Sequence, residues 1–182
     1  MRKATAIGVA TAAFLSPSGS ESLAVARSAS TCPAARVRHE VNPAFGTALQ
    51  ARWVAAQPRS SAITGVLFGG EEIDGRFALY AGGHNPVTDT NEKVLWVVDP
   101  GSRVGSWLTI VGHRIRVVGT RVRLARGSFR SRRFFEAGSE QTPGRIFPSI
   151  VNVPKPGCWR LEVRSGPRKG RLIVFVQPVP GG

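Results

Sequence analysis

The sequence predicts an all-β protein, an antiparallel β-sandwich or partly open barrel built from about nine short strands. Three observations favour this fold: short apolar runs alternate with clusters of Gly, Asp and Asn, the connections are brief, and no long helical segments intervene. Hydrophobic residues make up 42% of the 182-residue chain, which is enough for one core. The predicted strands are residues 63–68, 76–81, 93–98, 107–112, 114–117, 121–125, 146–151, 158–163 and 172–176.

The first predicted element is a signal peptide over residues 1–26. Two basic residues open the chain, and the residues that follow as far as Leu15 are apolar or small, a stretch too short to span a membrane. Ala24-Val25-Ala26 fits the small-x-small cleavage rule, and cleavage after Ala29 is the alternative. We therefore expect a bacterial protein that is secreted or held in the cell envelope, with no transmembrane segment in the mature chain.

An exposed arm, residues 27–60, is expected to precede the sandwich domain, residues 61–182. Residues 44–57 place apolar side chains at roughly helical spacing, which predicts either a short helix or a weak strand. Residues 93–98, KVLWVV, are apolar on both faces and indicate a central strand. The longest polar stretch, residues 126–144, is expected to form a mobile loop.

The chain has two cysteines, Cys32 and Cys158. In an oxidising compartment two thiols usually end as one disulfide bond. Alternation along residues 158–163 puts Trp159 on the core face and Cys158 on the outer face with the charged side chains. The bond is therefore expected to hold the arm against the outside of this strand. The alternative is that Cys32 is a lipid-modified N-terminus, although the residues before it lack the pattern of a lipobox.

Four motifs occur in order, namely NEKVLWVVDPG, LTIVGHRI, FPSIVNVPKPGCWRLEVRSG and a closing LIVFV. Together they resemble a family of small secreted or lipid-anchored bacterial proteins of unknown function, in which KVLW, LTI-G-RL and C-terminal PGCW motifs recur with a further cysteine upstream. The resemblance covers about residues 91–177, with Cys32 as the upstream match. It implies an immunoglobulin-like β-sandwich and no catalytic residues. The Arg-rich segment 121–133 departs from the family pattern, so a function based on it would not be family-wide.

Basic residues are in large excess, with a formal net charge of +14 at pH 7. Between Pro100 and Phe135 the sequence contains no acidic residue, and in RIRV and RVRLA arginines alternate with apolar residues. If these strands pair through Val118-Gly119-Thr120, four guanidinium groups line one face of a hairpin, where their fork geometry suits an anionic ligand. The candidate polyanion-binding residues are Arg114, Arg116, Arg121, Arg123, Arg126, Arg130, Arg132 and Arg133.

Three other roles stay open for these arginines. They extend into water, where salt screens their repulsion, or they keep an edge strand from aggregating, or they pair with acids elsewhere in the chain. If they bind a partner, anionic cell-wall polymers and lipid headgroups fit an exported protein. Export and the lack of interleaved aromatic residues argue against nucleic acid.

No pattern in the sequence points to a metal or a cofactor. His39, His84 and His113 lie in separate segments without local partner ligands. G-x-S-x-G, H-E-x-x-H and phosphate-cradling glycine loops are missing from the sequence.

Carboxylates for a hydrolase are available from Glu71, Glu72 and Asp74, but EEIDG indicates an exposed hairpin connection. We therefore predict a secreted, non-catalytic binding module of the cell envelope or extracellular space that contacts anionic polymers through its Arg-rich face. The alternatives are a structural or accessory envelope protein with incidental positive charge, and a hydrolase that uses these carboxylates.

Overall fold

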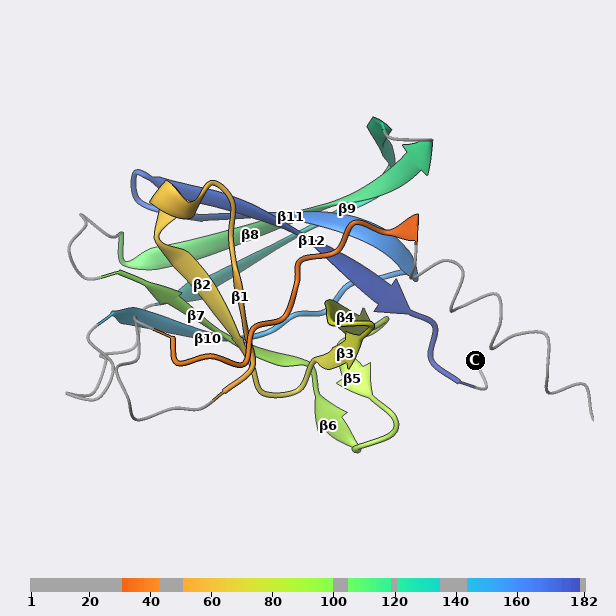
Figure 1. Ribbon diagram of the computed structural model, residues 1–182. Helices are drawn as coiled ribbons and strands as arrows, with labels where there is room; N and C mark the ends of the chain where they lie inside the picture. The colour runs from red at the N-terminus through yellow and green to blue at the C-terminus, as the bar shows by residue number, and fades with distance from the viewer. Residues whose placement is uncertain (1–30, 43–50, 100–104, 119–120, 135–143, 181–182) are drawn as a thin grey trace, which may run out of the picture.

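The computed structural model describes residues 31–42, 51–99, 105–118, 121–134 and 144–180. These residues form two main β-sheets packed against each other (Figure 1), which confirms the predicted all-β sandwich. The immunoglobulin-like form of this fold stays a prediction. The predicted signal peptide lies outside the described residues.

The first sheet has four strands in the order β1-β2-β7-β10, and the second has six in the order β3-β4-β12-β11-β8-β9. A separate hairpin pairs β5 with β6, and a single turn of 3-10 helix, η2 (Arg59–Ser61), precedes β2. The strand bounds are β1 (Trp53–Ala55), β2 (Ile63–Leu67), β3 (Glu71–Ile73), β4 (Arg76–Tyr80), β5 (His84–Asn85), β6 (Thr90–Asn91), β7 (Lys93–Val98), β8 (Trp107–Val118), β9 (Arg121–Phe134), β10 (Arg145–Ile150), β11 (Gly157–Ser165) and β12 (Arg168–Gln177).

The described residues form twelve strands, more than the seven to nine predicted. β3, β5 and β6 are two or three residues long, too short to show an alternating pattern in the sequence. The weak strand expected within residues 44–57 is confirmed at β1, and residues 43–50 lie outside the described part. All pairs of named strands are antiparallel except β12 and β4, which run parallel, and an isolated bridge between Ala81 and Val153 is also parallel. These two strands come from distant parts of the chain, so no hairpin turn fixes their relative direction.

The core lies between the two sheets and is built from alternating side chains, as the period of two predicts. Its largest members include Trp96 from the first sheet and Trp159 from the second, and both are fully buried. Each indole nitrogen donates a hydrogen bond, from Trp96 to Ser149 Oγ at 2.8 Å and from Trp159 to the Lys155 carbonyl at 2.9 Å. Buried indoles therefore contribute apolar packing without leaving a polar group unpaired.

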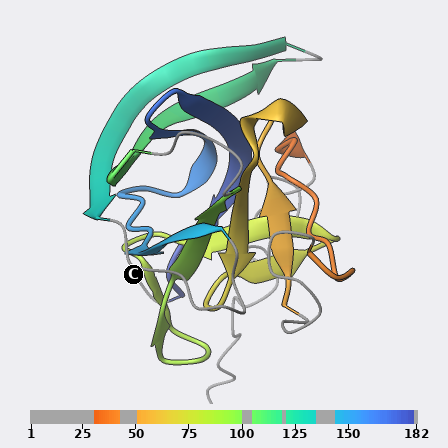
Figure 2. The same cartoon turned by 90° about the vertical axis from the view of Figure 1, so that its left-hand side faces the viewer.

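The β8–β9 hairpin differs most from the prediction. Residues 107–112 and 114–117, predicted as two strands, belong to one strand, β8. The loop predicted over residues 126–144 is wrong for residues 126–134, because β9 extends to Phe134. β9 arches along the edge of the six-stranded sheet (Figure 2). Its Phe129 packs on Trp159 with ring centroids 5.7 Å apart. A Cβ atom at Gly112, directly opposite, would lie 2.0 Å from the Phe129 ring, so this position requires glycine.

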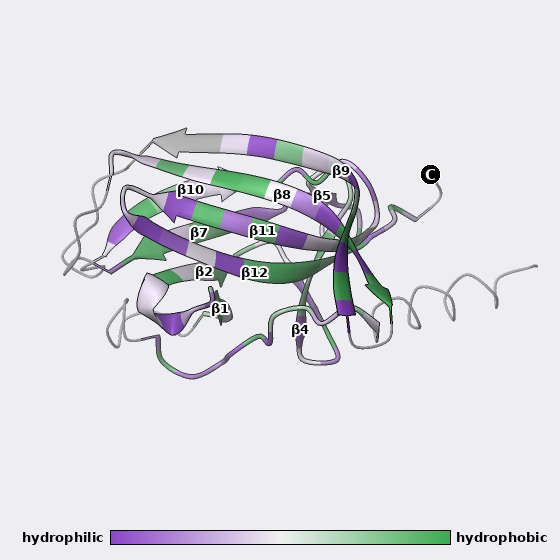
Figure 3. Cartoon of the chain, turned by 90° about the horizontal axis from the view of Figure 1, so that it is seen from above, coloured by the Kyte–Doolittle hydropathy of each residue, from purple (hydrophilic) through white to green (hydrophobic). Residues whose placement is uncertain are grey.

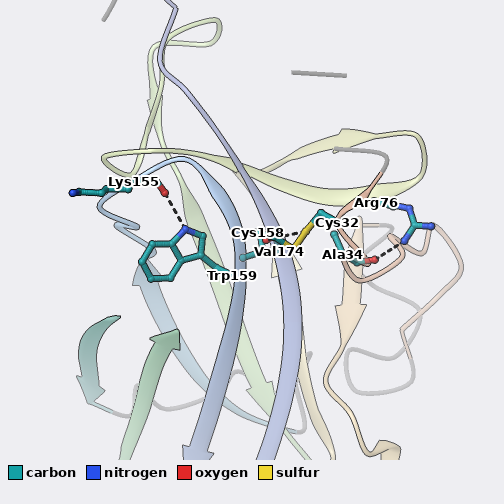
Figure 4. The surroundings of a disulfide bond; sticks show 7 residues. All are labelled: Cys32, Ala34, Arg76, Lys155, Cys158, Trp159 and Val174. Atoms are coloured by element: carbon teal, nitrogen blue, oxygen red, sulfur yellow. Dashed lines mark hydrogen bonds between the residues drawn. A yellow bond between two sulfur atoms is a disulfide. The ribbon is translucent and has the colours of Figure 1, made fainter. Parts of the chain in front are cut away.

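The predicted disulfide bond between Cys32 and Cys158 is confirmed, with the Cα atoms 5.6 Å apart. Figure 4 shows it on the outer side of β11, while the neighbouring Trp159 points the other way. Cys32 is buried in a small cluster with Ala34, Ala78 and Phe175 on the outer face of the six-stranded sheet. Because its sulfur is consumed in the disulfide, lipid attachment at Cys32, the predicted alternative, does not fit this structure.

Backbone hydrogen bonds continue the attachment of the arm beyond Cys32. The Ala35 amide donates to the Ile173 carbonyl of β12 at 2.7 Å, and the Phe77 amide of β4 donates to the Ala35 carbonyl at 2.8 Å. The Arg76 guanidinium adds a hydrogen bond of 3.1 Å to the Ala34 carbonyl (Figure 4). The arm therefore lies against β4 and β12 as an additional extended segment.

Replacing both cysteines with alanine should destabilise the fold without changing its sheets. The bond closes a loop across 126 positions of sequence. Removing such a constraint from the unfolded chain costs about 4–5 kcal/mol on the chain-entropy model. Urea unfolding of Cys32→Ala/Cys158→Ala, beside wild-type protein with and without reductant, measures the loss. A double variant as stable as oxidised wild type would contradict the stabilising role.

Candidate functional site

The hairpin predicted to carry the arginine cluster forms as expected. Arg116 lies directly opposite Arg123, and Val118 lies opposite Arg121. These three arginines are exposed. Like charges at directly opposed positions repel, and none of the three arginines forms an ion pair within the described residues.

Among the remaining predicted arginines, Arg114 lines a cavity of about 320 Å³ together with Arg116, and Arg126 and Arg130 do not line it. Arg114 is half-buried, and its guanidinium lies beside Gly157, where an added Cβ would be 3.2 Å from Nε. Arg126 lies at a register shift, because Ala125, Arg126 and Gly127 have no partner between the pairs His113–Ser128 and Ile115–Leu124. Arg130 lies beyond that shift on the main part of the sheet. Arg132 and Arg133 lie on β9, but their side chains are outside the described part.

The register shift bends the hairpin, whose end turns toward β12 (Figure 3). Val122, near this end, lines one cavity together with Arg160 of β11 and Ile173 of β12. The hairpin therefore approaches the outer face of the six-stranded sheet, and the arginines on this face extend the predicted cluster.

Cross-strand pairing places the outer-face side chains in rows. One row runs Arg130–Val111–Glu162–Arg171 across β9, β8, β11 and β12, and the next runs Thr109–Arg164–Lys169. Neighbouring residues within such a row are roughly 5 Å apart. Five of these seven side chains are charged, and only Glu162 is acidic.

Two cavities open on this outer face. The first, of about 830 Å³, is lined by the cations Arg130, Arg164, Lys169 and Arg171 together with Glu162. The second, of about 640 Å³, lies beside the arm, and Gln57 and Arg171 line both. We call the first the basic cavity and the second the arm cavity.

Little of the positive charge around the basic cavity is neutralised within the described residues. Glu162 Oε1 forms an ion pair with Arg160 Nη2 at 2.9 Å, so its charge is shared with a residue of the arm cavity. Arg130, Lys169 and Arg171 make no ion pair with any described residue. The surface is therefore suited to binding anions.

Sequence reasoning missed Arg164, Lys169 and Arg171 as site residues. The signal was present, because Arg160, Glu162 and Arg164 alternate with the core residues of one strand. What the sequence did not show is that Lys169 and Arg171 of β12 lie beside them and that Arg130 joins from β9. That arrangement depends on the pairing of strands distant in sequence.

The carboxylates considered for hydrolysis are less exposed than EEIDG suggests. Glu71 and Glu72 are half-buried in β3, while Asp74 is exposed in the turn that follows. Glu71 accepts hydrogen bonds from Asn85 Nδ2 at 3.2 Å and Gln177 Nε2 at 3.1 Å. The Glu72 carboxylate lies 2.9 Å from His39 Nε2. Each glutamate therefore has its own structural partners.

Glu92 is a buried carboxylate that sequence reasoning did not identify. Its exposed fraction is 0%, its Oε1 accepts a 2.9 Å hydrogen bond from the Tyr80 amide, and its Oε2 has no partner among the described residues. Burial and, less strongly, the charge of Glu71 raise the Glu92 pKa to about 7, although the Tyr80 amide and Arg52 oppose the shift. Burial and the nearby Glu71 also raise the pKa of Tyr80.

The histidines do not converge. His39 lies beside Glu72, His84 Nε2 lies 3.2 Å from Asp89 Oδ1, and His113 is on the outer face between Arg160 and Ser128. Among the described residues no group of three or more potential ligand side chains is placed to hold a metal ion. The same part of the chain contains no helix of the length and apolar character needed to cross a bilayer.

Comparison with protein-family models, with curated proteins and with solved structures gives no match to this chain. The family resemblance of the KVLW, LTI-G-RL and PGCW motifs therefore stays a prediction. What the structure defines is a disulfide-bonded β-sandwich with a basic outer face on its larger sheet.

Glu92 should make the fold less stable as the pH rises. Its pKa is about 7 in the folded chain against an ordinary value of 4.5, so its protonated form favours folding, and this contribution declines between about pH 4.5 and pH 7. We expect Glu92→Gln to remove a decline on the order of 2 kcal/mol from the free energy of unfolding. Urea unfolding at pH 5 and pH 8 measures it, with the exposed Glu40→Gln as control. An unchanged pH dependence in Glu92→Gln would contradict this assignment.

Proposed function

We propose that the protein is a secreted, non-catalytic binding module of the cell envelope or extracellular space that contacts an anionic polymer. The observation that carries the proposal is the basic cavity, where four cationic side chains from β9, β11 and β12 surround one acidic residue, Glu162. The disulfide bond supports an oxidising compartment. Anionic wall polymers are partners of suitable charge in such a place.

The arrangement of charge favours a polymer over a single small anion. The basic cavity and the end of the β8–β9 hairpin each hold a directly opposed pair of cations, Arg164–Lys169 and Arg116–Arg123. Such a pair destabilises a sheet by up to about 1 kcal/mol, which a bound anion would offset. Because the two groups are on separate parts of the surface, a chain with repeated charges contacts both, whereas a small anion contacts one.

Arginine is well suited to this role. Its planar guanidinium presents several donors in a fixed geometry that matches phosphate and carboxylate oxygens. Binding to cationic side chains also releases counterions from the polymer. This release makes the free energy of binding more favourable, by an amount that decreases as the salt concentration rises. Binding to the proposed surface is therefore expected to be strong at low ionic strength and tolerant of polymer sequence.

Charge reversal in the basic cavity should weaken polymer binding. For Lys169→Glu/Arg171→Glu we expect the dissociation constant for polyphosphate to rise at least about tenfold at low salt, with a shallower salt dependence. The matched control, Lys93→Glu/Lys155→Glu, changes the net charge equally at exposed positions that line neither outer-face cavity. Isothermal titration calorimetry over a salt series measures both variants.

Three outcomes would contradict the proposal. If both double variants lose affinity equally, the net charge and not this surface attracts the polymer. If neither loses affinity, the positive charge of the basic cavity is incidental, as in a structural envelope protein. If the wild type binds vesicles containing phosphatidylglycerol but not polyphosphate, the partner is a lipid surface.

A further inference from the structure

The arm cavity has a composition unlike that of the basic cavity. Its walls come from the arm, β1, β11, β12 and the end of the β8–β9 hairpin. Apolar side chains on several of these segments face it, including Pro33, Ala35, Val122 and Ile173. Its volume of about 640 Å³ lies within the range of sites that enclose small molecules.

The arm cavity also carries positive charge, and its lining contains no acidic residue. Arg36, Arg38, Arg160 and Arg171 all line the arm cavity. Arg38 is partly neutralised, since its Nη1 lies 2.8 Å from Glu40 Oε1 and its guanidinium stacks 4.9 Å over the Trp53 ring. Arg36 and Arg171 are exposed and make no ion pair within the described residues.

Arg160 supplies an unsatisfied donor. Its Nη2 forms an ion pair with Glu162, but its Nε is buried and has no hydrogen-bond partner among the described residues. A buried donor of a charged group that lacks an acceptor is unfavourable. The Arg160 side chain as a whole is 27% exposed, so an anionic group in the arm cavity would pair with the positive charge of this guanidinium.

We infer that the arm cavity binds a single-chain anionic amphiphile, with its carboxylate at Arg160 and Arg171 and its hydrocarbon chain along Ala35, Val122 and Ile173. Neutral chains would leave the guanidinium groups without a counter-charge, and cationic chains would be repelled. A tail-less anion would leave the apolar walls in water. This inference goes beyond polymer binding, which requires the basic cavity and not an apolar enclosure.

Chain length and charge together test this ligand class. We expect decanoate, below its micellar concentration, to bind tighter than hexanoate by about threefold or more for each additional methylene that is buried. Decyltrimethylammonium, which has the same chain and the opposite charge, should not bind. Isothermal titration calorimetry measures affinity, and amide chemical shifts at Ala35 and Ile173 report the location.

A pair of variants on the hairpin provides the matched control. Val122 lines the arm cavity with 44% of its surface exposed, whereas Val118 is 53% exposed and does not line the cavity. We expect Val122→Asp to weaken decanoate binding at least about tenfold by placing a charge against the chain, and Val118→Asp to leave it within about twofold. Arg160→Gln should weaken decanoate binding as well, because the charged donor is lost.

The inference is overturned if decanoate and hexanoate bind equally, if the cationic amphiphile binds as well as decanoate, or if Val118→Asp and Val122→Asp behave alike. Decanoate that does not bind at all overturns it too. Circular dichroism confirms that each variant is folded. Lys169→Gln should weaken polyphosphate binding but leave decanoate binding within about twofold, because Lys169 lines the basic cavity and not the arm cavity, so the two proposals fail independently.

Discussion

The alternation of side chains along β11 is the constraint on which the rest of the structure depends. Trp159, Leu161 and Val163 point into the core, while Cys158, Arg160, Glu162 and Arg164 point out. The strand lies between β12 and β8, so the same residues set the register of both neighbours. A slip of one residue would bury the charges and expose the indole. The disulfide bond, the core and both cavities thus share one strand.

Much of this arrangement follows from local sequence. The period of two predicts β2, β4, β7 and β10–β12 closely, and it places Trp159 inward and Cys158 outward from the sequence alone. β9 was predicted only over residues 121–125, because the polar, Arg-rich sequence that follows resembles a loop. Its strand conformation depends on pairing with β8, supported by the contact of Phe129 with Trp159 and by the space that Gly112 leaves on the paired strand. Contacts between distant segments of this kind leave no periodic signal.

The candidate site shows the same limit. Local reasoning found the hairpin that carries Arg116 and Arg123, since both strands and their turn are contiguous in sequence. It missed Lys169 and Arg171, which become neighbours of Arg130 only through the order of strands in the sheet. It also missed Glu92, a single acidic residue before a strand, whose burial results from packing around Tyr80. Composition predicted the net positive charge, whereas the order of strands in the sheet determines which cationic side chains become neighbours.

The N-terminal arm has a second consequence beyond stabilising the sandwich. It supplies one wall of the arm cavity through Pro33, Ala35, Arg36 and Arg38, and its only covalent attachment to β11 is the sulfur–sulfur bond at Cys158. Thiol exchange at this bond would leave the wall held by backbone hydrogen bonds and a small apolar cluster alone. The geometry of the arm cavity therefore depends on the oxidation state of this one bond.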